Sequence, residues 1–332
     1  MLGPLQHVEA FRNSLVEWFQ SEGKSYPWRD TQDPWRILVS EVMLQQTQIK
    51  TVLKFYEKFL EQFPTPESLA HASEEEILSA WEGLGYYRRV RNLQKAALSI
   101  TESNQGKFPR DFDQILALPG IGRYTAGAVY SFAFNSPAPI VDANVARVLA
   151  RLFDYGERVD SSAGQKQLWN WAELLLSREF PREYNSAIME LGQTYCTVTE
   201  PHCQSCPVSE FCEAKDPGSL PRKKSKAPIL KVDEFCAFHF DDQKGVLMVQ
   251  ESQRREGMWK FPMRAPEEFE QSPLLYKKSY GITRYRVTLH VYLHSQLEIR
   301  EAEKWIALDQ LDQIPIASPF RKALDTLLED MI

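Results

Sequence analysis

The sequence predicts a mainly α-helical domain followed by a smaller α+β domain. Three observations support this. The chain has 332 residues, and domains of roughly 150 residues would divide it into about two. From residue 5 to about residue 211 the apolar residues recur at helical spacing, and after a segment rich in Pro, Gly and Lys they form short β-branched and aromatic runs. We therefore expect a helical domain at 1–215, a linker at 216–232 and a second domain at 233–332.

The helical expectation comes from apolar stripes and from capping residues. Residues 5–19 and 52–60 each place their apolar side chains three or four positions apart. Residues 35–48 also read as one helix. Ser73 followed by Glu76 matches a capping box at the start of another helix. Nothing in this region predicts a strand.

The second domain shows strand patterns and one helix. Residues 234–240, 245–249 and 284–293 are the expected strands, and in the last of them apolar residues alternate with polar or smaller ones. Residues 319–331 form an amphipathic pattern at helical spacing. We therefore expect a small α+β fold here.

The composition is that of an ordinary globular protein. Hydrophobic residues make up 43% and charged residues 25%, which excludes collagen-like, mucin-like and disordered chains. No run of 18 apolar residues occurs, and the start lacks the basic and apolar regions of a signal peptide. We expect a cytoplasmic protein with no membrane partner. No heptad seam suggests self-association, so we expect a monomer.

The net charge of −6 is unevenly distributed. Residues 84–151 contain nine basic and four acidic side chains, a local charge of +5. This segment is a candidate surface for nucleic-acid phosphates, although a solvated helix face is the alternative reading. The basic residues are Arg88, Arg89, Arg91, Lys95, Lys107, Arg110, Arg123, Arg147 and Arg151.

Four of the five cysteines lie in one loop at 196–212. Cys196, Cys203, Cys206 and Cys212 have the spacing C-x6-C-x2-C-x5-C. A compact run of four thiolates favours a [4Fe-4S] cluster over zinc, which usually takes two separated C-x2-C pairs. Zinc and unligated thiols remain alternatives. Cys236 lies among aromatic residues and is expected to be a buried apolar side chain.

The segment LPGIGRYTAGAV at 118–129 places two glycines between helical stretches. Gly120 and Gly122 would leave the backbone amides of the turn free to approach a phosphate oxygen. An ordinary corner between two helices is the alternative. No strand precedes the turn and the third glycine of a dinucleotide fingerprint is missing.

Two carboxylates stand out in the helical domain. Glu41 falls on the apolar face of its predicted helix, where burial would raise its pKa and keep it protonated as a general acid. The alternative is a residue at the edge of the stripe that reaches water. Asp142 precedes an apolar-periodic segment and reads as an N-cap. An ionised carboxylate there could also stabilise a cationic sugar.

These motifs, in this order, resemble a known group of enzymes. LPGIG, the VDANVARV segment and the four-cysteine loop make residues 1 to about 215 similar to the endonuclease III superfamily of helix-hairpin-helix DNA glycosylases. SEVMLQQTQ at 40–48, PWR at 27–29 and GLGYYRRVRNL at 83–93 narrow the resemblance to the adenine DNA glycosylase (MutY) family. The resemblance implies a glycosylase domain with an iron-sulfur cluster loop, followed by a Nudix-like domain that reads 8-oxoguanine.

The resemblance also implies a reaction in base excision repair. Adenine mispaired with 8-oxoguanine or G in double-stranded DNA is flipped out and its N-glycosidic bond is hydrolysed, which leaves an abasic site. Glu41 would protonate adenine and Asp142 would stabilise the oxocarbenium-like sugar, with Tyr124 and Asn144 beside it. Lytic relatives carry a Lys where Tyr124 stands, so a monofunctional enzyme without a Schiff base is expected. A bacterial-type, nucleoid-associated location follows from the same resemblance.

The remaining residues carried over from the resemblance contact DNA. Gln45 and Tyr86 match wedge positions, Trp28, Arg29 and Leu44 map near the adenine pocket, and Gly120 and Gly122 match the hairpin. The chain departs from the family pattern at two places. Ser186 stands where a Gln or Glu is expected, and Ile282-Thr283-Arg284 stands where a Phe-Ser-His turn is expected.

Two other readings are possible. One is an endonuclease III-like glycosylase and lyase for damaged pyrimidines, which Tyr124, Glu41 and the second domain disfavour. The other is a catalytically silent DNA-binding protein that kept the cluster and the hairpin. The second domain lacks the Nudix glutamate pattern on a helix, so pyrophosphate hydrolysis is not expected.

Overall fold

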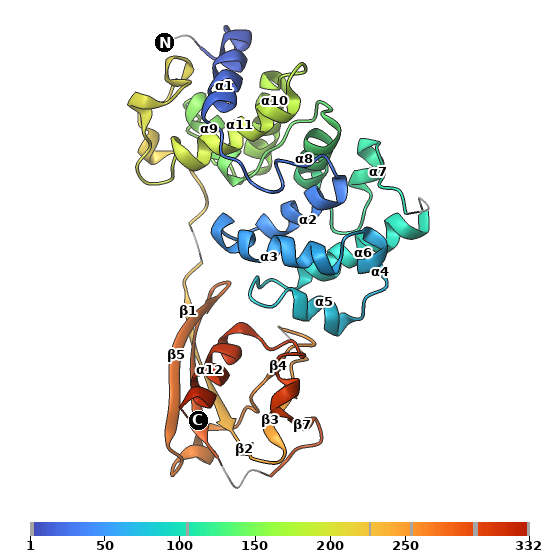
Figure 1. Cartoon of the computed structure of the whole chain (residues 1–332). Helices are drawn as coiled ribbons and strands as arrows, with labels where there is room; N and C mark the ends of the chain where they lie inside the picture. Colours follow the sequence, from blue (N-terminus) through green and yellow to red (C-terminus); the bar gives the residue numbers. More distant parts are fainter. Residues whose placement is uncertain (1–2, 104–105, 226, 253–254, 295–297, 331–332) are drawn as a thin grey trace. The chain divides into compact units, whose positions relative to one another are not determined.

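The computed structural model describes residues 3–103, 106–225, 227–252, 255–294 and 298–330 (Figure 1). The chain divides into two compact units, each built from several segments. The first unit comprises Met1–Val52, Pro64–Ala70 and Asn92–Ser225, and the second comprises Leu53–Phe63, His71–Arg91 and Lys226–Ile332. The domain limits at 215 and 233 stay a prediction.

The chain before residue 226 is helical, as the sequence predicts. Its described residues contain no β-strand. The helices are α1 (Val8–Glu22), α2 (Pro34–Leu44), α3 (Ile49–Gln62), α4 (Pro66–Ala70), α5 (Glu74–Ala80), α6 (Arg88–Ser103), α7 (Phe112–Leu116), α8 (Arg123–Phe134), α9 (Ala143–Leu152), α10 (Ser162–Leu175) and α11 (Pro181–Thr194). Three short 3-10 turns follow at Cys203–Ser205, Ser209–Phe211 and Pro217–Ser219.

Side-chain caps begin several of these helices. Asp33 accepts hydrogen bonds from the amides at the start of α2, whose first residue is Pro34. Ser161 caps α10 in the same way. The predicted capping box of Ser73 and Glu76 is present at α5. Local sequence therefore determines where these helices start.

One core of the first unit joins distant parts of the chain. Helices α1, α9, α10 and α11 pack their apolar faces together, and Val208 and Phe211 of the cysteine loop belong to the same core. Phe11 of α1 meets Phe211 edge to face. A second contact joins α2 to α8, and α8 also contacts α11. The elements that carry Glu41, Tyr124 and Asp142 are therefore held on one scaffold.

The described chain after residue 226 has the predicted α+β character. One sheet has the order β1-β6-β5, with β1 (Leu230–Phe238) parallel and β5 (Leu274–Ile282) antiparallel to β6 (Tyr285–Leu293). The other sheet is built around β3 (Gly245–Gln250), which pairs with β2 (Phe240–Asp241), β4 (Trp259–Lys260) and β7 (Glu303–Ile306). Helix α12 spans Ser318–Glu329, and Met331 of the predicted helix lies outside the described residues.

The last predicted strand is present as β6, and part of its predicted apolar face is buried, although His290 between Leu289 and Val291 is buried as well. Val287, Leu289 and Val291 of β6 are buried, and Cys236 on the neighbouring β1 is fully buried as expected. The turn between β5 and β6 consists of Thr283 and Arg284, both exposed. Thr283 has a φ of 50°, a left-handed conformation that costs energy for a β-branched residue.

Several details differ from the sequence predictions. Strand β1 begins at Leu230, inside the predicted linker at 216–232, and the predicted strand at 234–240 is divided between β1 and β2. Strand β5 was not predicted. Helix α2 ends at Leu44 and not at residue 48, because Gln46 adopts a left-handed φ of 57° that a helix cannot contain. Leu5 precedes α1 and is exposed. Arg89, Arg147 and Arg151 of the basic segment are buried, so these three guanidinium groups are structural and do not form a phosphate-facing surface. No described helix has the length and hydropathy that crossing a membrane requires.

Candidate active site

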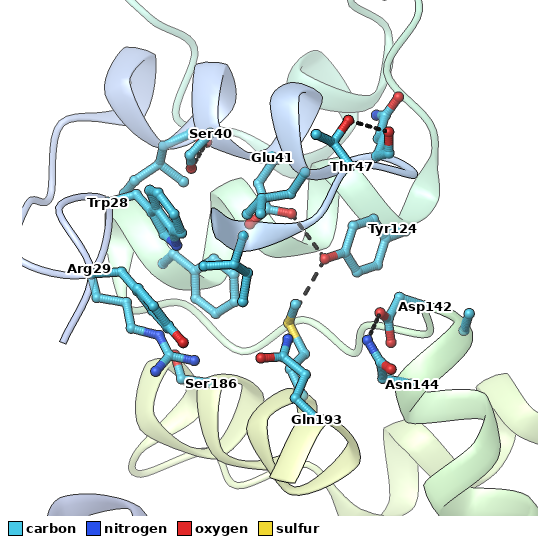
Figure 2. A pocket seen from close by; sticks show the side chains of 18 of the residues that line it. Trp28, Arg29, Ser40, Glu41, Thr47, Tyr124, Asp142, Asn144, Ser186 and Gln193 are labelled. Atoms are coloured by element: carbon cyan, nitrogen blue, oxygen red, sulfur yellow. Dashed lines mark hydrogen bonds between the residues drawn. The ribbon is translucent and has the colours of Figure 1, made fainter. Parts of the chain in front are cut away.

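A pocket of about 860 Å³ opens in the first unit between α2, α8, the start of α9 and α11 (Figure 2). It collects most of the site residues that the sequence predicts. Those that line it are Trp28, Arg29, Glu41, Leu44, Gln45, Tyr124, Asp142 and Asn144. Segments separated by more than 100 residues in the sequence therefore build one cavity.

Glu41 lies in the wall of the pocket on α2. Its side chain is buried, and the Tyr124 hydroxyl donates a hydrogen bond of 2.9 Å to Glu41 Oε2 (Figure 2). Burial raises the pKa of Glu41 to about 7; the Tyr124 hydrogen bond opposes this shift, and the nearby Asp142 adds to it. The predicted burial of this carboxyl group is confirmed. At neutral pH it can hold a proton and release it.

Tyr124 connects the carboxyl group to the other side of the pocket. Burial and the neighbouring carboxylates raise its pKa well above the ordinary value, so the phenol stays protonated and acts as a donor. Its hydroxyl also lies 3.8 Å from Met189 Sδ on α11. The ring is therefore held between α2 and α11.

Asp142 is the N-cap of α9, as predicted. Its Oδ1 accepts a hydrogen bond of 2.7 Å from the Val145 amide, and its Oδ2 accepts one of 3.0 Å from Asn144 Nδ2. Burial raises the pKa of Asp142, while these two donors favour the carboxylate and lower it. Asn144 is oriented in turn by Arg147, whose Nη2 donates to Asn144 Oδ1 at 3.0 Å.

Aromatic and cationic groups form the opposite wall. Trp28 stacks on Tyr26 with ring centroids 5.2 Å apart. The Arg29 guanidinium lies 5.0 Å from the ring centroids of both Phe19 and Tyr26 and forms an ion pair with Glu190 of α11. A flat base could lie against this wall, since stacked rings offer an apolar face.

Sequence reasoning missed several residues of the pocket. These include Gln48, Arg182, Met189 and Gln193, together with Glu190 behind Arg29. Glu190 is 1% exposed and sits among apolar residues of α11, which is the same signal that singled out Glu41. Ser186, where a longer polar side chain was expected, lines the pocket and is buried.

The predicted hairpin joins α7 to α8 outside the pocket. Gly120 has a φ of 77°, and Gly122 is the N-cap of α8. The Arg123 guanidinium lies 3.9 Å from the Trp169 ring centroid, so this cation is held at the start of α8. Tyr86 belongs to the second unit, where it is exposed and adopts a φ of 49°.

The four cysteines of the loop contain no disulfide. Cys196, Cys206 and Cys212 pack against the core of the first unit, and the buried Arg151 donates a 3.4 Å hydrogen bond to Cys196 Sγ. Among the described residues, no three His, Cys, Asp or Glu side chains converge on a position for a single metal ion. Four free thiols gathered in one loop with a cation beside them still fit a cluster, whose ligands lie farther apart than those of one ion.

Comparisons with known proteins agree with this geometry. Residues 39–174 match the model of the HhH-GPD superfamily of base excision DNA repair proteins. A thermostable thymine-DNA glycosylase of known structure is 31% identical, with a TM-score of 0.57, over 62% of this chain and 95% of that one. The adenine DNA glycosylase of Buchnera aphidicola (subsp. Baizongia pistaciae) is 33% identical over 80% of this chain and 76% of its own length. This chain belongs to the adenine DNA glycosylase family.

The human adenine DNA glycosylase is 44% identical over 63% of this chain. That match covers 40% of the human protein, so this chain corresponds to about two fifths of its length. An endonuclease III bound to DNA is 28% identical, with a TM-score of 0.53, over 62% of this chain and 95% of that one. The predicted family membership is confirmed. The superfamily match contains Glu41, the glycine hairpin and Asp142 and ends before the cysteine loop, so it supports the glycosylase fold without testing the cluster.

Proposed function

We propose that this protein is a monofunctional adenine DNA glycosylase that hydrolyses the N-glycosidic bond of adenine mispaired with 8-oxoguanine or G in double-stranded DNA. The observation that carries the proposal is the arrangement of Glu41, Tyr124 and Asp142 around one pocket. A carboxylic acid whose pKa is raised to about 7 beside a second, hydrogen-bonded carboxyl group is the pairing that glycosidic bond cleavage requires.

Glu41 serves as the general acid. Its proton passes to a ring nitrogen of the flipped adenine, so that the electron pair of the breaking C–N bond leaves on a neutral base. Tyr124 donates to Glu41 Oε2 and stabilises the carboxylate that remains after the transfer. General acid catalysis of this kind contributes about 10²- to 10⁴-fold to the rate.

Asp142 stabilises the positive charge that develops on the sugar. The Val145 amide and Asn144 Nδ2 hold its two oxygens, so the carboxylate is oriented before the substrate arrives. Water then attacks the sugar carbon and gives an abasic site. No lysine lines the pocket in the described part of the chain, which supports hydrolysis without a Schiff base and without strand cleavage.

The proposed DNA contacts are Gln45, Tyr86 and the hairpin. Gln45 follows α2 and lines the pocket, and it and the exposed Tyr86 of the second unit are the side chains proposed to fill the gap left by the flipped base. The amides at Gly120 and Gly122 grip a phosphate. Residues 233–332 are proposed to read the base opposite adenine as a Nudix-like domain, with Thr283 and Arg284 at the exposed turn.

Cys196, Cys203, Cys206 and Cys212 are proposed to hold a [4Fe-4S] cluster. The cluster's role would be to hold the loop whose Val208 and Phe211 complete the helical core, because four protein ligands leave no open iron for chemistry. We further propose that the enzyme is a monomer and that it is associated with the nucleoid in the cytoplasm of a bacterial-type cell.

Single-turnover base release tests the proposal. Three duplexes carry A opposite 8-oxoguanine, A opposite G, and an oxidised pyrimidine. Release of free adenine, with strand cleavage only after alkali treatment, is the expected result. Excision of the pyrimidine with direct nicking, or efficient covalent trapping by borohydride, would contradict it, and no base release from any duplex would favour a silent DNA-binding protein.

A further inference from the structure

Arg29 and Glu41 line the same pocket, and a direct ion pair between them would disable the acid. Both line the cavity, and the positive charge of Arg29 lowers the pKa of Glu41. An arginine that paired directly with a buried carboxylate would lower the pKa of that carboxylate by about one to three pH units. The structure avoids this pairing, and the contacts of Arg29 show how.

Glu190 on α11 forms an ion pair with the guanidinium of Arg29. The ion pair joins Arg29 Nη1 to Glu190 Oε2, and the Glu190 side chain is 2% exposed. Arg29 Nη1 also donates to the Lys24 carbonyl at 2.7 Å, while the Lys24 amide donates to Glu190 Oε1 at 3.0 Å. These three contacts form a closed ring between the loop before α2 and the helix α11.

Two aromatic rings also contact the Arg29 guanidinium. The guanidinium lies at 5.0 Å from the centroids of Phe19 and Tyr26, which favours its charge on that side of the pocket. Figure 2 shows the Arg29 side chain directed toward the helix that carries Ser186, away from the Glu41 carboxyl group. Geometry and charge therefore both hold Arg29 on the α11 side.

We propose that Glu190 is a positioning residue that keeps the Arg29 guanidinium from pairing with Glu41, so that Glu41 stays available as a proton donor. This inference rests on the proposed function for its purpose, but the contacts that carry it do not depend on the substrate. Without the Glu190 carboxylate, the charge of Arg29 would be left unpaired at a partly buried wall. Glu41, which lines the pocket with Asp142 and Glu183, is one of the carboxyl groups that could then pair with it.

Several titratable and charged groups surround Glu41 in the pocket. From α8 the Tyr124 hydroxyl donates to it, from the start of α9 Asp142 raises its pKa, and from the loop before α2 Arg29 lowers it. Arg182 and Glu183 of α11 also line the pocket. Arg182 donates to the carbonyls of Arg29 and Thr31, so it braces the loop and leaves Glu190 as the ion-pair partner of Arg29.

The test is a titration of the Glu41 carboxyl group in the intact protein by infrared difference spectroscopy, with Glu41→Gln used to assign the band. In Glu190→Gln the midpoint of the Glu41 titration is expected to fall by about one pH unit or more. Adding Arg29→Gln to that variant is expected to return the midpoint to the wild-type value or above it. Glu190→Asp keeps a carboxylate on a shorter side chain. Its Glu41 midpoint is therefore expected to lie between those of the wild type and Glu190→Gln.

Glu173→Gln is the matched control. Glu173 also pairs with an arginine, Arg178, at 2.9 Å in the same unit, but both side chains are exposed, so the Glu41 midpoint should not move. An unchanged midpoint in Glu190→Gln would overturn the proposal. So would a lowered midpoint that persists when Arg29 is also replaced.

Adenine release measured across the same pH range then links the titration to activity. The alkaline side of the rate profile should shift with the Glu41 midpoint. The rate of Glu190→Gln should therefore be about tenfold below that of the wild type near pH 8 and nearly equal to it near pH 5.5. A uniform loss of rate at every pH would mean that Glu190 is only structural. If the wild-type protein released no adenine, the proposed function would fail while the infrared result on Glu190 would still stand or fall by itself. Should Glu190→Gln fold poorly, Glu190→Asp still decides, because a Glu41 midpoint equal to that of the wild type in this variant would overturn the proposal.

Discussion

At the scale of single residues, the molecule depends on one buried acid. Glu41 is 3% exposed, and its oxygen atom accepts from a phenol that is itself buried in the pocket. A sequence shows that a glutamate lies on an apolar helix face; it does not show which side chain meets it. The distance between Glu41 and Tyr124 in the chain is 83 residues, so only folding could create this pair.

Replacing Glu41 by Gln should remove catalysis and leave DNA binding. We expect base release to fall by about 10²-fold or more, because the amide keeps the size of the side chain but cannot deliver the proton. Affinity for the mispaired duplex, measured by fluorescence anisotropy, should stay within about threefold of wild type. Wild-type rates in Glu41→Gln would assign the acid to another group.

The same substitution should stabilise the protein at neutral and alkaline pH. Folding raises the pKa of Glu41 from 4.5 to about 7, so the native state keeps a proton that the unfolded chain loses between these values. The free energy of unfolding of the wild type therefore falls as pH rises from 4.5 to 7, by about 3 kcal/mol at most.

Glu41→Gln lacks this loss. Its stability advantage over wild type, measured by urea denaturation, should be smallest near pH 4.5 and reach its full size above pH 7. An advantage that stays constant across this pH range would show that Glu41 does not titrate in the folded protein as the structure indicates.

At the scale of elements, the hairpin before α8 shows that two neighbouring glycines meet different requirements. Gly120 has a φ of 77°, and a Cβ there would stand 2.6 Å from Asn92 Cβ. Gly122 has a φ of −97°, and a Cβ there would have nothing within 4 Å. The sequence motif does not distinguish the two glycines. The structure shows that Gly120 is needed for its left-handed backbone conformation, whereas Gly122 leaves open space beside the backbone.

Gly120→Ala should lower the free energy of unfolding by about 1 to 2 kcal/mol or more, because the left-handed backbone and the close Asn92 both oppose a side chain. Gly122→Ala, the matched control, should leave thermal stability unchanged and weaken binding to any duplex, since its methyl group would stand where the backbone approaches a phosphate. Equal stability of the two variants would contradict the assigned conformation.

Helix α9 combines a cap with a site residue. Asp142→Asn keeps an oxygen for the Val145 amide and loses the charge, whereas Asp142→Ala loses both. We expect both variants to lose base release, but only the alanine variant to lose about 1 kcal/mol of stability. Chemical denaturation and single-turnover kinetics on the two proteins separate these roles.

At the scale of the whole molecule, the cysteine loop closes a core that α1 begins. Val208 and Phe211 belong to the same core as Phe11 and Leu15, although the two pairs lie near opposite ends of the helical part of the sequence. A group that holds this loop would therefore stabilise the packing of both ends, because metal binding adds directly to folding free energy.

Cys196→Ser should lower the iron content of the purified protein and its melting temperature by several degrees, about 2 kcal/mol or more in stability. The matched control is Cys236→Ala, which removes a buried thiol outside the loop. It should leave the iron content unchanged even where packing loss lowers stability. Zinc instead of iron in the wild-type protein would refute the cluster.

The sequence alone determined the change from helical to mixed α and β structure along the chain, the capping of α5 and α9, the place of Glu41 on an apolar helix face and the family. These follow from local signals, because apolar period and capping side chains act within a few residues. The four cysteines of the loop were also recognisable in the sequence, although the [4Fe-4S] cluster that they would bind stays a prediction.

Tertiary structure decided what no local pattern contains. It placed Tyr124 against Glu41, buried Arg147 and Arg151 inside a segment that looks like a basic surface, and brought Glu190 to Arg29 from 161 residues away. The left-handed Gln46 ended α2 at Leu44, four residues before the predicted end of the helix at Gln48. The physical reason is that pairing, desolvation and charge depend on neighbours in space, and those neighbours exist only once the helices have packed.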